Sequence, residues 1–203
     1  MQEQHPGPSR RSVVIFDLDG TLTKPDLDFD VIRAEIGVEG PILEAMERMA
    51  PDQRKRAESI LVRYEHAAAD RAELQEGVLE VLARLRDAGY GLAILTRNSR
   101  ANVDAILSRF GIEVDALRTR DDGAIKPSAE PVLSLCSELD ADPGNSWMVG
   151  DYLFDIQSGR AAGAKTVLMI GDRERPDFAD QADHTITRML DLLPIVGAGS
   201  RRA

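Results

Sequence analysis

The sequence predicts an α/β protein with a doubly wound, mainly parallel sheet. Short continuous apolar runs suit strands that are buried on both faces, and amphipathic helical stripes alternate with these runs along the chain. A third observation is the stretch 24–75, which contains no strand-like run and predicts a small all-helical cap inserted after the first strand. The 203 residues, 43% of them hydrophobic, suffice for one domain with a sizeable core.

Five apolar runs are the predicted strands. They are rich in β-branched residues or Leu, and the third run is the least apolar of them. Runs this short and this apolar are typical of parallel strands covered by helices on both sides. The predicted strands are residues 13–16, 92–95, 114–117, 147–149 and 166–170.

Four amphipathic helices are predicted in the same part of the chain. Gly89, Gly111 and Gly163 follow three of them, at the position where a left-handed residue ends a helix. Pro131 lies in the first turn of another, where proline is favoured. The apolar stripes of these helices span residues 78–85, 103–110, 132–139 and about 153–162.

The stretch without strands carries two further helical stripes, one opened near Pro41 over residues 42–49 and one over residues 60–68. Two or three helices here form the predicted cap. The resulting division assigns residues 1–23 and 76–203 to an α/β core domain and 24–75 to the helical cap, with loose tails over 1–11 and 197–203.

Composition and charge exclude several classes of partner. The formal net charge of −10 argues against nucleic acid, because phosphate backbones require clustered Lys and Arg. No stretch approaches the roughly 20 apolar residues of a membrane span, so we expect no membrane partner and a cytoplasmic protein. Cys136 is the only cysteine, which rules out an intramolecular disulfide.

Polar residues of catalytic type follow the predicted strands. In an open α/β sheet the ligand binds beyond the carboxyl ends of the strands, so residues that are distant in sequence meet at one edge. A loop before the third core helix adds a lysine to this set. We expect one site to gather Asp17, Asp19, Thr96, Arg97, Asn98, Lys126, Asp151 and Asp155.

The acidic members of this set predict a divalent cation. Carboxylates placed together repel one another and raise each other's pKa values, whereas a bound cation favours their ionised forms. The three histidines are scattered along the chain, so only oxygen ligands are available. Magnesium is therefore the metal we expect.

Asp17 and Asp19 suit two different roles in catalysis. They are two residues apart, so on an extended chain their side chains share a face. One carboxylate can attack an electrophile while the other, kept protonated, donates to the leaving group. Gly20 permits the tight turn by which the chain leaves the site.

These residues resemble the four motifs of the haloacid dehalogenase-like (HAD) superfamily, in the same order. The resemblance extends over about residues 13–183 and implies a HAD-like Rossmannoid core. The helical insert is similar to the C1-type cap of phosphoglycolate phosphatase-like members. The matching positions are residues 17–23 (DLDGTLT), Thr96, Lys126 with Pro127, and Gly150-Asp151 with Asp155.

The resemblance implies a phosphatase that hydrolyses a small phosphorylated metabolite through an aspartyl-phosphate. Asp17 would attack phosphorus. Asp19 would protonate the leaving oxygen and then deprotonate the hydrolytic water. Magnesium would be held by the carboxylates of Asp17 and Asp151 and the backbone carbonyl of Asp19, with Asp155 supporting it.

The resemblance also implies a set of phosphate-binding groups, and the chain departs from the family pattern beside them. Tyr152 stands where the family usually has a small residue, and Arg97 stands where it often has Asn. Arg97 could pair with a second anionic group of the substrate or begin a surface helix. The phosphate-binding candidates are Thr96, Lys126, the backbone around Leu18, Arg97 and Asn98.

The residues also bear on the alternatives to a phosphatase. Asp19 argues against a dehalogenase, which lacks the second aspartate of the first motif. A phosphonate hydrolase would need a cap lysine, and neither Lys24 nor Lys55 is well placed to serve. A phosphomutase of the same fold and a phospho-accepting regulator that does not turn over both stay open. The protein could be a monomer or a homodimer.

Overall fold

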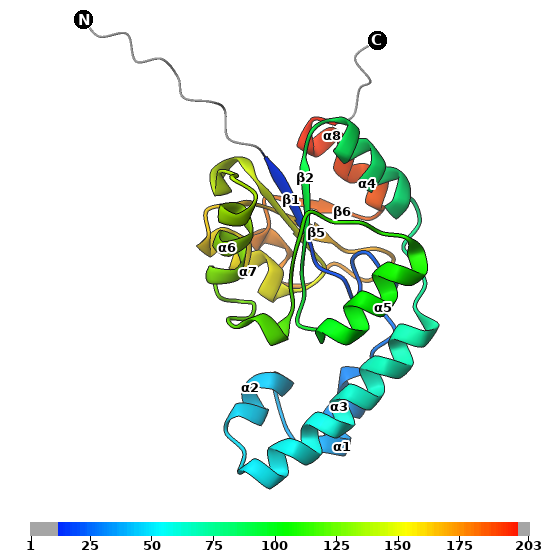
Figure 1. Ribbon diagram of the computed structural model, residues 1–203, viewed down its shortest axis with the longest axis vertical. Helices are drawn as coiled ribbons and strands as arrows, with labels where there is room; N and C mark the ends of the chain where they lie inside the picture. Colours follow the sequence, from blue (N-terminus) through cyan, green and yellow to red (C-terminus); the bar gives the residue numbers. More distant parts are fainter. Residues whose placement is uncertain (1–11, 199–203) are drawn as a thin grey trace, which may run out of the picture.

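Six parallel strands form one sheet at the centre of the structure (Figure 1). The computed structural model describes residues 12–198. The order of the strands is β3-β2-β1-β4-β5-β6, and the predicted doubly wound α/β fold is confirmed. The strands are β1 (Val13–Phe16), β2 (Gly91–Leu95), β3 (Ala116–Arg118), β4 (Trp147–Gly150), β5 (Lys165–Met169) and β6 (His184–Ile186).

The direction of the chain across the sheet reverses at β1. From β1 the chain builds β2 and β3 on one side, and then returns to place β4 on the other side. Such a reversal leaves a crevice beyond the carboxyl ends of the two central strands, where open α/β sheets bind ligands. The pairing between β1 and β4 continues into this crevice, because the Asp17 N–H donates to the Val149 carbonyl oxygen at 2.8 Å.

Helices cover both faces of the sheet, and the two-residue period of the strands explains how. Val14 and Phe16 point into the larger apolar core, whereas Val13 and Ile15 point into a second core on the opposite face. All four side chains of β1 are fully buried. The covering helices are α4 (Val78–Asp87), α5 (Arg100–Phe110) and α8 (Leu192–Val196) on the first face, and α6 (Glu130–Glu138) and α7 (Leu153–Ala161) on the second.

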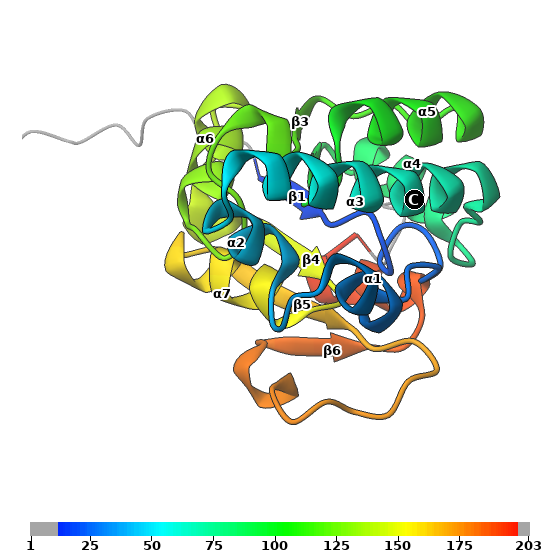
Figure 2. The same cartoon turned by 90° about the horizontal axis from the view of Figure 1, so that it is seen from below.

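Three helices follow the first strand and form a unit of their own, which we call the helical unit. They are α1 (Phe29–Ile36), α2 (Ile42–Glu47) and α3 (Pro51–Arg71), and they pack around a small apolar cluster that includes Ile32 and Leu61. Figures 1 and 2 show the helical unit beside one end of the sheet; in the view from below, α1 and α2 lie in front of β4 and β5.

The structure differs from the sequence-based expectations at the ends of elements and at two short elements. β3 begins two residues later than predicted, although the Asp115 N–H still donates to the Leu92 carbonyl. The strand β6 and the helix α8 were not predicted, because three to five residues carry too little periodicity to be recognised.

The predicted C-terminal tail is wrong at its start. Gly197 ends α8 in a left-handed conformation with φ of 83°, and Ala198 is 8% exposed in the larger core. The rest of the predicted tails, residues 1–11 and 199–203, lies outside the described residues.

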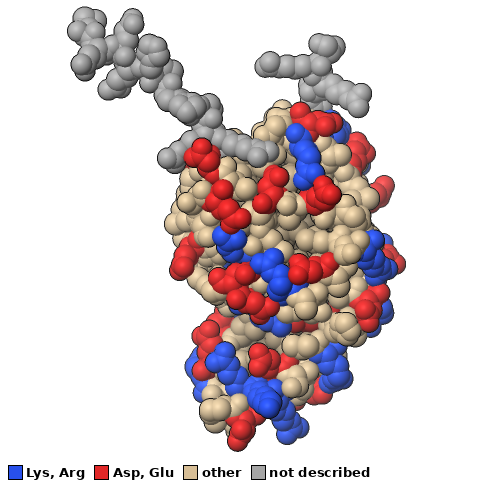
Figure 3. All heavy atoms as spheres, in the orientation of Figure 1, with Lys and Arg blue, Asp and Glu red and all other residues tan. Residues whose placement is uncertain are grey.

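The surface carries both signs of charge. On the face shown in Figure 3, acidic side chains are interspersed with Lys and Arg over the core and the helical unit. Among the described residues, no helix is long and apolar enough to cross a membrane. Cys136 is buried within the second core as a free thiol, as expected of a small apolar residue.

The contact between α7 and the sheet depends on a glycine. A Cβ atom at Gly159 would lie 2.8 Å from both the Met148 Cβ and the Thr166 Cγ2 atoms, which are too close to the backbone to move away. We expect Gly159→Val to lower the free energy of unfolding by about 1–3 kcal/mol through overpacking. Urea unfolding checks this, with Gln157→Ala on the exposed side of α7 as the control. An unchanged stability of Gly159→Val would contradict this account of the packing.

Candidate active site

The candidate site lies in a cleft between the carboxyl ends of the strands and the helical unit. The cleft has a volume of about 690 Å³, a size typical of sites for small ligands. The structure brings most of the residues predicted for the site into its lining. These are Asp17, Asp19, Thr96, Arg97, Asn98, Lys126, Asp151 and Asp155, whereas Leu18 is fully buried beneath the lining.

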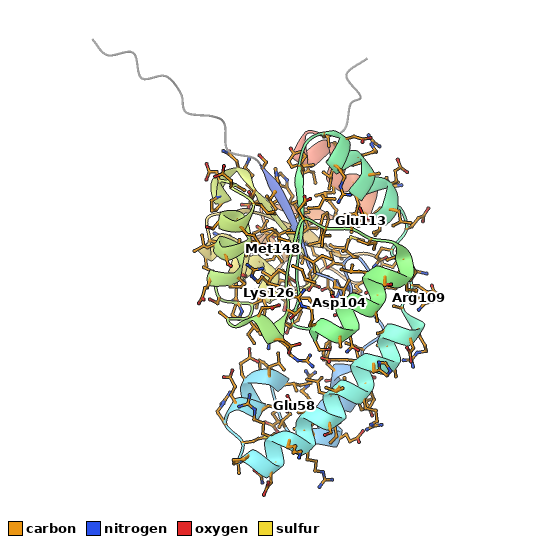
Figure 4. The ribbon with its side chains drawn as sticks, viewed as in Figure 1. Glu58, Asp104, Arg109, Glu113, Lys126 and Met148 are labelled. Carbon is orange, nitrogen blue, oxygen red and sulfur yellow. The ribbon has the colours of Figure 1, made fainter. Side chains whose placement is uncertain are left out.

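A buried lysine joins two of the aspartates. The Lys126 Nζ atom lies 2.5 Å from the Asp17 Oδ1 atom and 2.6 Å from the Asp155 Oδ1 atom. The side chains of Lys126 and Asp155 are 3% and 2% exposed, so water screens these contacts little. Figure 4 shows Lys126 in the part of the core that lies toward the helical unit. The Thr21 hydroxyl also donates to the Asp17 Oδ2 atom, at 3.4 Å.

The beginning of α7 positions Asp155. Its Oδ2 atom accepts a hydrogen bond from the Tyr152 N–H at 3.0 Å, which satisfies one of the free N–H groups at the helix start. The chain must pass close to this carboxylate, and a Cβ atom at Gly150 would lie 2.1 Å from the Asp155 Cγ atom. Glycine is therefore required at position 150, because a larger residue would collide with Asp155.

Three of the carboxylates form a group that could hold a metal ion. Oxygen atoms of Asp17, Asp151 and Asp155 all lie within 4.8 Å of one another. Burial raises the pKa of Asp17 well above its usual value, Lys126 opposes this rise, and the neighbouring carboxylates add to it. Burial and the charge of Asp155 raise the pKa of Asp151 to about 6. A site with this excess of negative charge and these hard oxygen donors fits a divalent cation such as Mg²⁺.

Asp19 occupies a different environment from these three carboxylates. Burial raises its pKa, although a hydrogen bond from the Asn98 Nδ2 atom to its Oδ2 atom at 3.0 Å opposes the rise. A carboxyl with a raised pKa can remain protonated and serve as a proton donor. The Asp19 side chain is not part of the group that could hold a metal. The resemblance assigns its backbone carbonyl to the metal, and this stays a prediction.

Thr96 and Asn98 are held in place at the end of β2. The Thr96 N–H donates to the Arg118 carbonyl on β3 at 3.0 Å, and the Thr96 hydroxyl oxygen accepts from the Asn98 N–H at 3.1 Å. The Asn98 Oδ1 atom accepts from the Ser99 N–H at 2.8 Å, immediately before α5. Asn98 is 5% exposed and connects Asp19 to this helix start.

Arg97 has partners in both parts of the molecule. Its two Nη atoms bind the two carboxylate oxygens of Glu44 on α2, at 2.8 and 2.7 Å. Its Nη1 atom also donates to the Lys126 carbonyl at 2.6 Å. The guanidinium carbon lies 4.7 Å from the centre of the Phe154 ring. Only 20% of the Arg97 side chain is exposed, so Arg97 is not a surface residue at the start of a helix.

Two ion pairs at the site were not predicted from the sequence. Glu65 on α3 binds Arg120 through both carboxylate oxygens, at 2.5 and 2.8 Å, and Glu65 is 5% exposed. Arg173 lies 3.0 Å from the Asp151 Oδ2 atom. Two signals could have indicated these residues: Glu65 interrupts the apolar stripe of its helix, and Arg120 and Arg173 follow strands at the same edge as the predicted residues.

Several known proteins are similar to this chain in sequence. The profile of the haloacid dehalogenase-like hydrolase family matches residues 32–169. The chain is 35% identical to the pyrophosphatase PpaX of Bacillus pumilus, over 92% of this chain and 97% of the relative. It is 31% identical to the N-acetylmuramic acid 6-phosphate phosphatase of Pseudomonas aeruginosa, over 77% of this chain and 80% of the relative.

Solved structures are similar to this chain in fold. A crystal structure of a predicted phosphoglycolate phosphatase from Haemophilus somnus superposes with a TM-score of 0.73 and 23% sequence identity. The superposition covers 93% of this chain and 99% of that chain. At this identity the likeness concerns the fold.

The raised pKa of Asp151 predicts how metal binding depends on pH. The cation binds the ionised carboxylate, so affinity is highest above a pH of about 6 and falls as the pH drops through that value. We expect Mg²⁺ to bind at least about tenfold more weakly at pH 5 than at pH 7, because about a tenth of a group with this pKa is ionised at pH 5. Titration calorimetry measures this, with the exposed Asp104→Asn as a control. Equal affinity at both pH values would contradict the prediction.

Proposed function

The chain belongs to the haloacid dehalogenase-like hydrolase family, and on this premise we propose that it is a Mg²⁺-dependent phosphatase of a small phosphorylated metabolite. One observation carries the proposal. Where the strand order reverses, Asp17 is held by Lys126 and faces Asp151 and Asp155, and the half-buried Asp19 lines the same cleft. This arrangement supplies a nucleophile, a proton donor and positive charge.

In the first half of the proposed reaction, a carboxylate oxygen of Asp17 attacks phosphorus. The bond between phosphorus and the ester oxygen breaks, and the leaving oxygen takes the proton that Asp19 holds. The products are an aspartyl-phosphate at Asp17 and a free alcohol. The raised pKa of Asp19 supports this role, since the group must be protonated when the substrate arrives.

In the second half, water attacks phosphorus and gives its proton to the carboxylate of Asp19. The bond between phosphorus and the Asp17 oxygen breaks, inorganic phosphate leaves, and both aspartates return to their starting forms. The Lys126 ammonium and the Thr96 hydroxyl bind phosphoryl oxygens, and Lys126 also orients Asp17. The Leu18 backbone and Asn98 complete the set of candidates for phosphate binding, whereas Arg97, the remaining candidate from the sequence, is engaged by Glu44.

The metal site supports the same chemistry. When bound by Asp17, Asp151 and Asp155, a divalent cation would neutralise phosphoryl oxygens and favour the ionised form of Asp17. Burial and the neighbouring carboxylates raise the pKa of Asp17, whereas a nucleophilic carboxylate must be ionised. This conflict supports a metal-dependent enzyme.

The relatives support the reaction class. The names of the two curated relatives describe phosphatases, one of pyrophosphate and one of a sugar phosphate.

General acid–base catalysis contributes about 10²–10⁴-fold, whereas hydrolysis of phosphate monoesters requires accelerations of up to about 10²¹-fold. Charge neutralisation and positioning must supply much of the rest, and the site combines several groups for this purpose.

We also propose that residues 24–75 act as a cap over a core formed by residues 1–23 and 76–203. The helical unit contributes Glu65 to the lining of the cleft and contacts the core through Glu44 and Arg97. A cap in this position excludes bulk water from the reacting atoms while it admits the water needed for hydrolysis.

Replacement of the proposed nucleophile tests the function. We expect Asp17→Asn to abolish release of phosphate from a panel of phosphorylated metabolites in Mg²⁺, because the amide cannot form the aspartyl-phosphate. The variant should fold normally, as measured by circular dichroism, and Asp104→Asn on the surface should keep wild-type activity. A wild-type protein that becomes labelled by phosphate without turnover would instead support a regulator. An active Asp17→Asn would contradict the mechanism.

Asp19→Asn separates the two halves of the reaction. With p-nitrophenyl phosphate, the leaving nitrophenolate requires no proton, so the first half should remain fast. Hydrolysis of the intermediate should slow by about 10²–10⁴-fold, because the base is lost. Stopped-flow measurement should therefore show a burst of one equivalent of nitrophenolate followed by slow turnover. A uniform loss without a burst would argue against the role of Asp19 in the second half.

A further inference from the structure

Arg97 and Tyr152, the two departures from the family pattern, both lie in the cleft beside the proposed site of phosphoryl transfer. Arg97 is the cation that could bind a second anionic group on a substrate. In the structure its two Nη atoms bind Glu44 instead, and its face covers the Phe154 ring. This ion pair is largely buried, with 20% of the Arg97 and 31% of the Glu44 side chain exposed.

The other cations of the cleft are paired as well. Six acidic and four basic side chains line it, and each basic one has an acidic partner. Lys126 binds two aspartates of the site, and Arg173 binds Asp151. Arg33 at the outer part binds Asp30 on its own helix at 2.5 Å. An anionic leaving group would therefore have to displace a carboxylate from one of these cations.

The wall of the cleft next to Arg97 is apolar. Tyr152 and Phe154 pack edge to face, with ring centres 5.2 Å apart, and Tyr152 is 53% exposed. Aromatic faces of this kind bind apolar and planar groups. Across the cleft, α2 and the segment before α1 supply further apolar side chains, among them Leu27, Ile42 and Leu43.

We propose that the substrate is a phosphate monoester with an uncharged, largely apolar leaving group, and that Glu44 sets this preference by occupying Arg97. The proposal rests on the phosphatase function proposed above and names the class of its substrate. An uncharged leaving group contacts Tyr152 and Phe154 and leaves the ion pair intact. An anionic one finds Arg97 engaged by Glu44 and meets an excess of acidic side chains in the lining of the cleft, so the site selects against it.

This preference distinguishes the chain from the pyrophosphatase to which it is similar. The leaving group of pyrophosphate is itself a phosphate and carries negative charge. Phosphoglycolate carries a carboxylate in the same position. We expect both compounds to be poor substrates of this protein, although the chemistry at phosphorus is the same.

A matched pair of substrates tests the proposal. In 4-carbamoylphenyl phosphate and 4-carboxyphenyl phosphate the leaving groups have nearly the same shape and differ by one negative charge. We expect the wild-type enzyme in Mg²⁺ to have at least about tenfold higher kcat/KM for the amide. The carboxylate can reach Arg97 only by displacing Glu44, and hydrogen bonds to a charged partner are worth a factor of this size or more. The intrinsic reactivities of the two esters differ slightly. This difference cancels when the ratio of kcat/KM for the two substrates is compared between variants.

Three variants locate the cause of the preference. Glu44→Gln keeps the shape of the side chain but removes its charge, so Arg97 can receive the carboxylate and the ratio should fall by about tenfold. Glu47→Gln removes the same charge from an exposed position of α2 and should leave the ratio unchanged. Arg97→Gln should also keep the preference for the amide, because in the wild type Arg97 does not bind the substrate.

The outcomes separate this proposal from the function on which it rests. Equal use of both compounds by the wild type would overturn the proposal, as would an unchanged ratio in a folded Glu44→Gln. A selective loss of activity toward the carboxylate substrate in Arg97→Gln would show that Arg97 already binds anions in the wild type. This result would overturn the proposal even if Glu44→Gln does not fold. Turnover of pyrophosphate or phosphoglycolate alone would refute the substrate class and leave the phosphatase function standing. Failure to release phosphate from any compound would refute the function itself.

Discussion

The ion pairs of Lys126 with Asp17 and Asp155 are the interaction on which the rest of the site depends. Three carboxylates from two segments of the chain converge at the end of a buried strand pair, where their mutual repulsion is strong and water is scarce. A lysine that is 3% exposed compensates part of this charge and holds two of the carboxylates. The remaining negative charge is what makes the place suitable for a divalent cation. Charge balance therefore connects the proposed nucleophile, the candidate metal site and the buried lysine in one arrangement.

The fold supplies this arrangement at a position set by its topology. Asp17 ends the first strand, Asp151 follows the fourth, and these two strands are neighbours because the chain reverses direction between them. Close packing then fixes the details. A Cβ atom at Gly20 would lie 2.4 Å from the Asp151 Oδ2 atom, so the loop after Asp17 can approach this carboxylate only with glycine there.

Two bidentate ion pairs connect the helical unit to the core across the cleft. Glu44 binds Arg97 and Glu65 binds Arg120, and both pairs use two parallel contacts of a planar guanidinium. Pairs of this geometry favour one orientation of the two parts of the molecule. They also remove two cations from the surroundings of a bound ligand. The same contacts that position the helical unit thus shape the charge that a substrate meets.

The sequence by itself determined the fold class, five of the six strands and most of the polar residues that line the cleft. Apolar runs and glycine-terminated helices follow from local patterns of burial, and the acidic residues at strand ends needed only the rule that parallel strands share one edge. The short elements β6 and α8 left no such pattern. The partners of Arg97 and Arg120 were decided by tertiary structure, because Glu44 and Glu65 lie more than 50 residues away and reach them only through the packing of the helical unit on the core. A charged side chain in a sequence gives no sign of whether it binds a ligand or a neighbour, since that depends on which opposite charge the fold brings within a few ångströms.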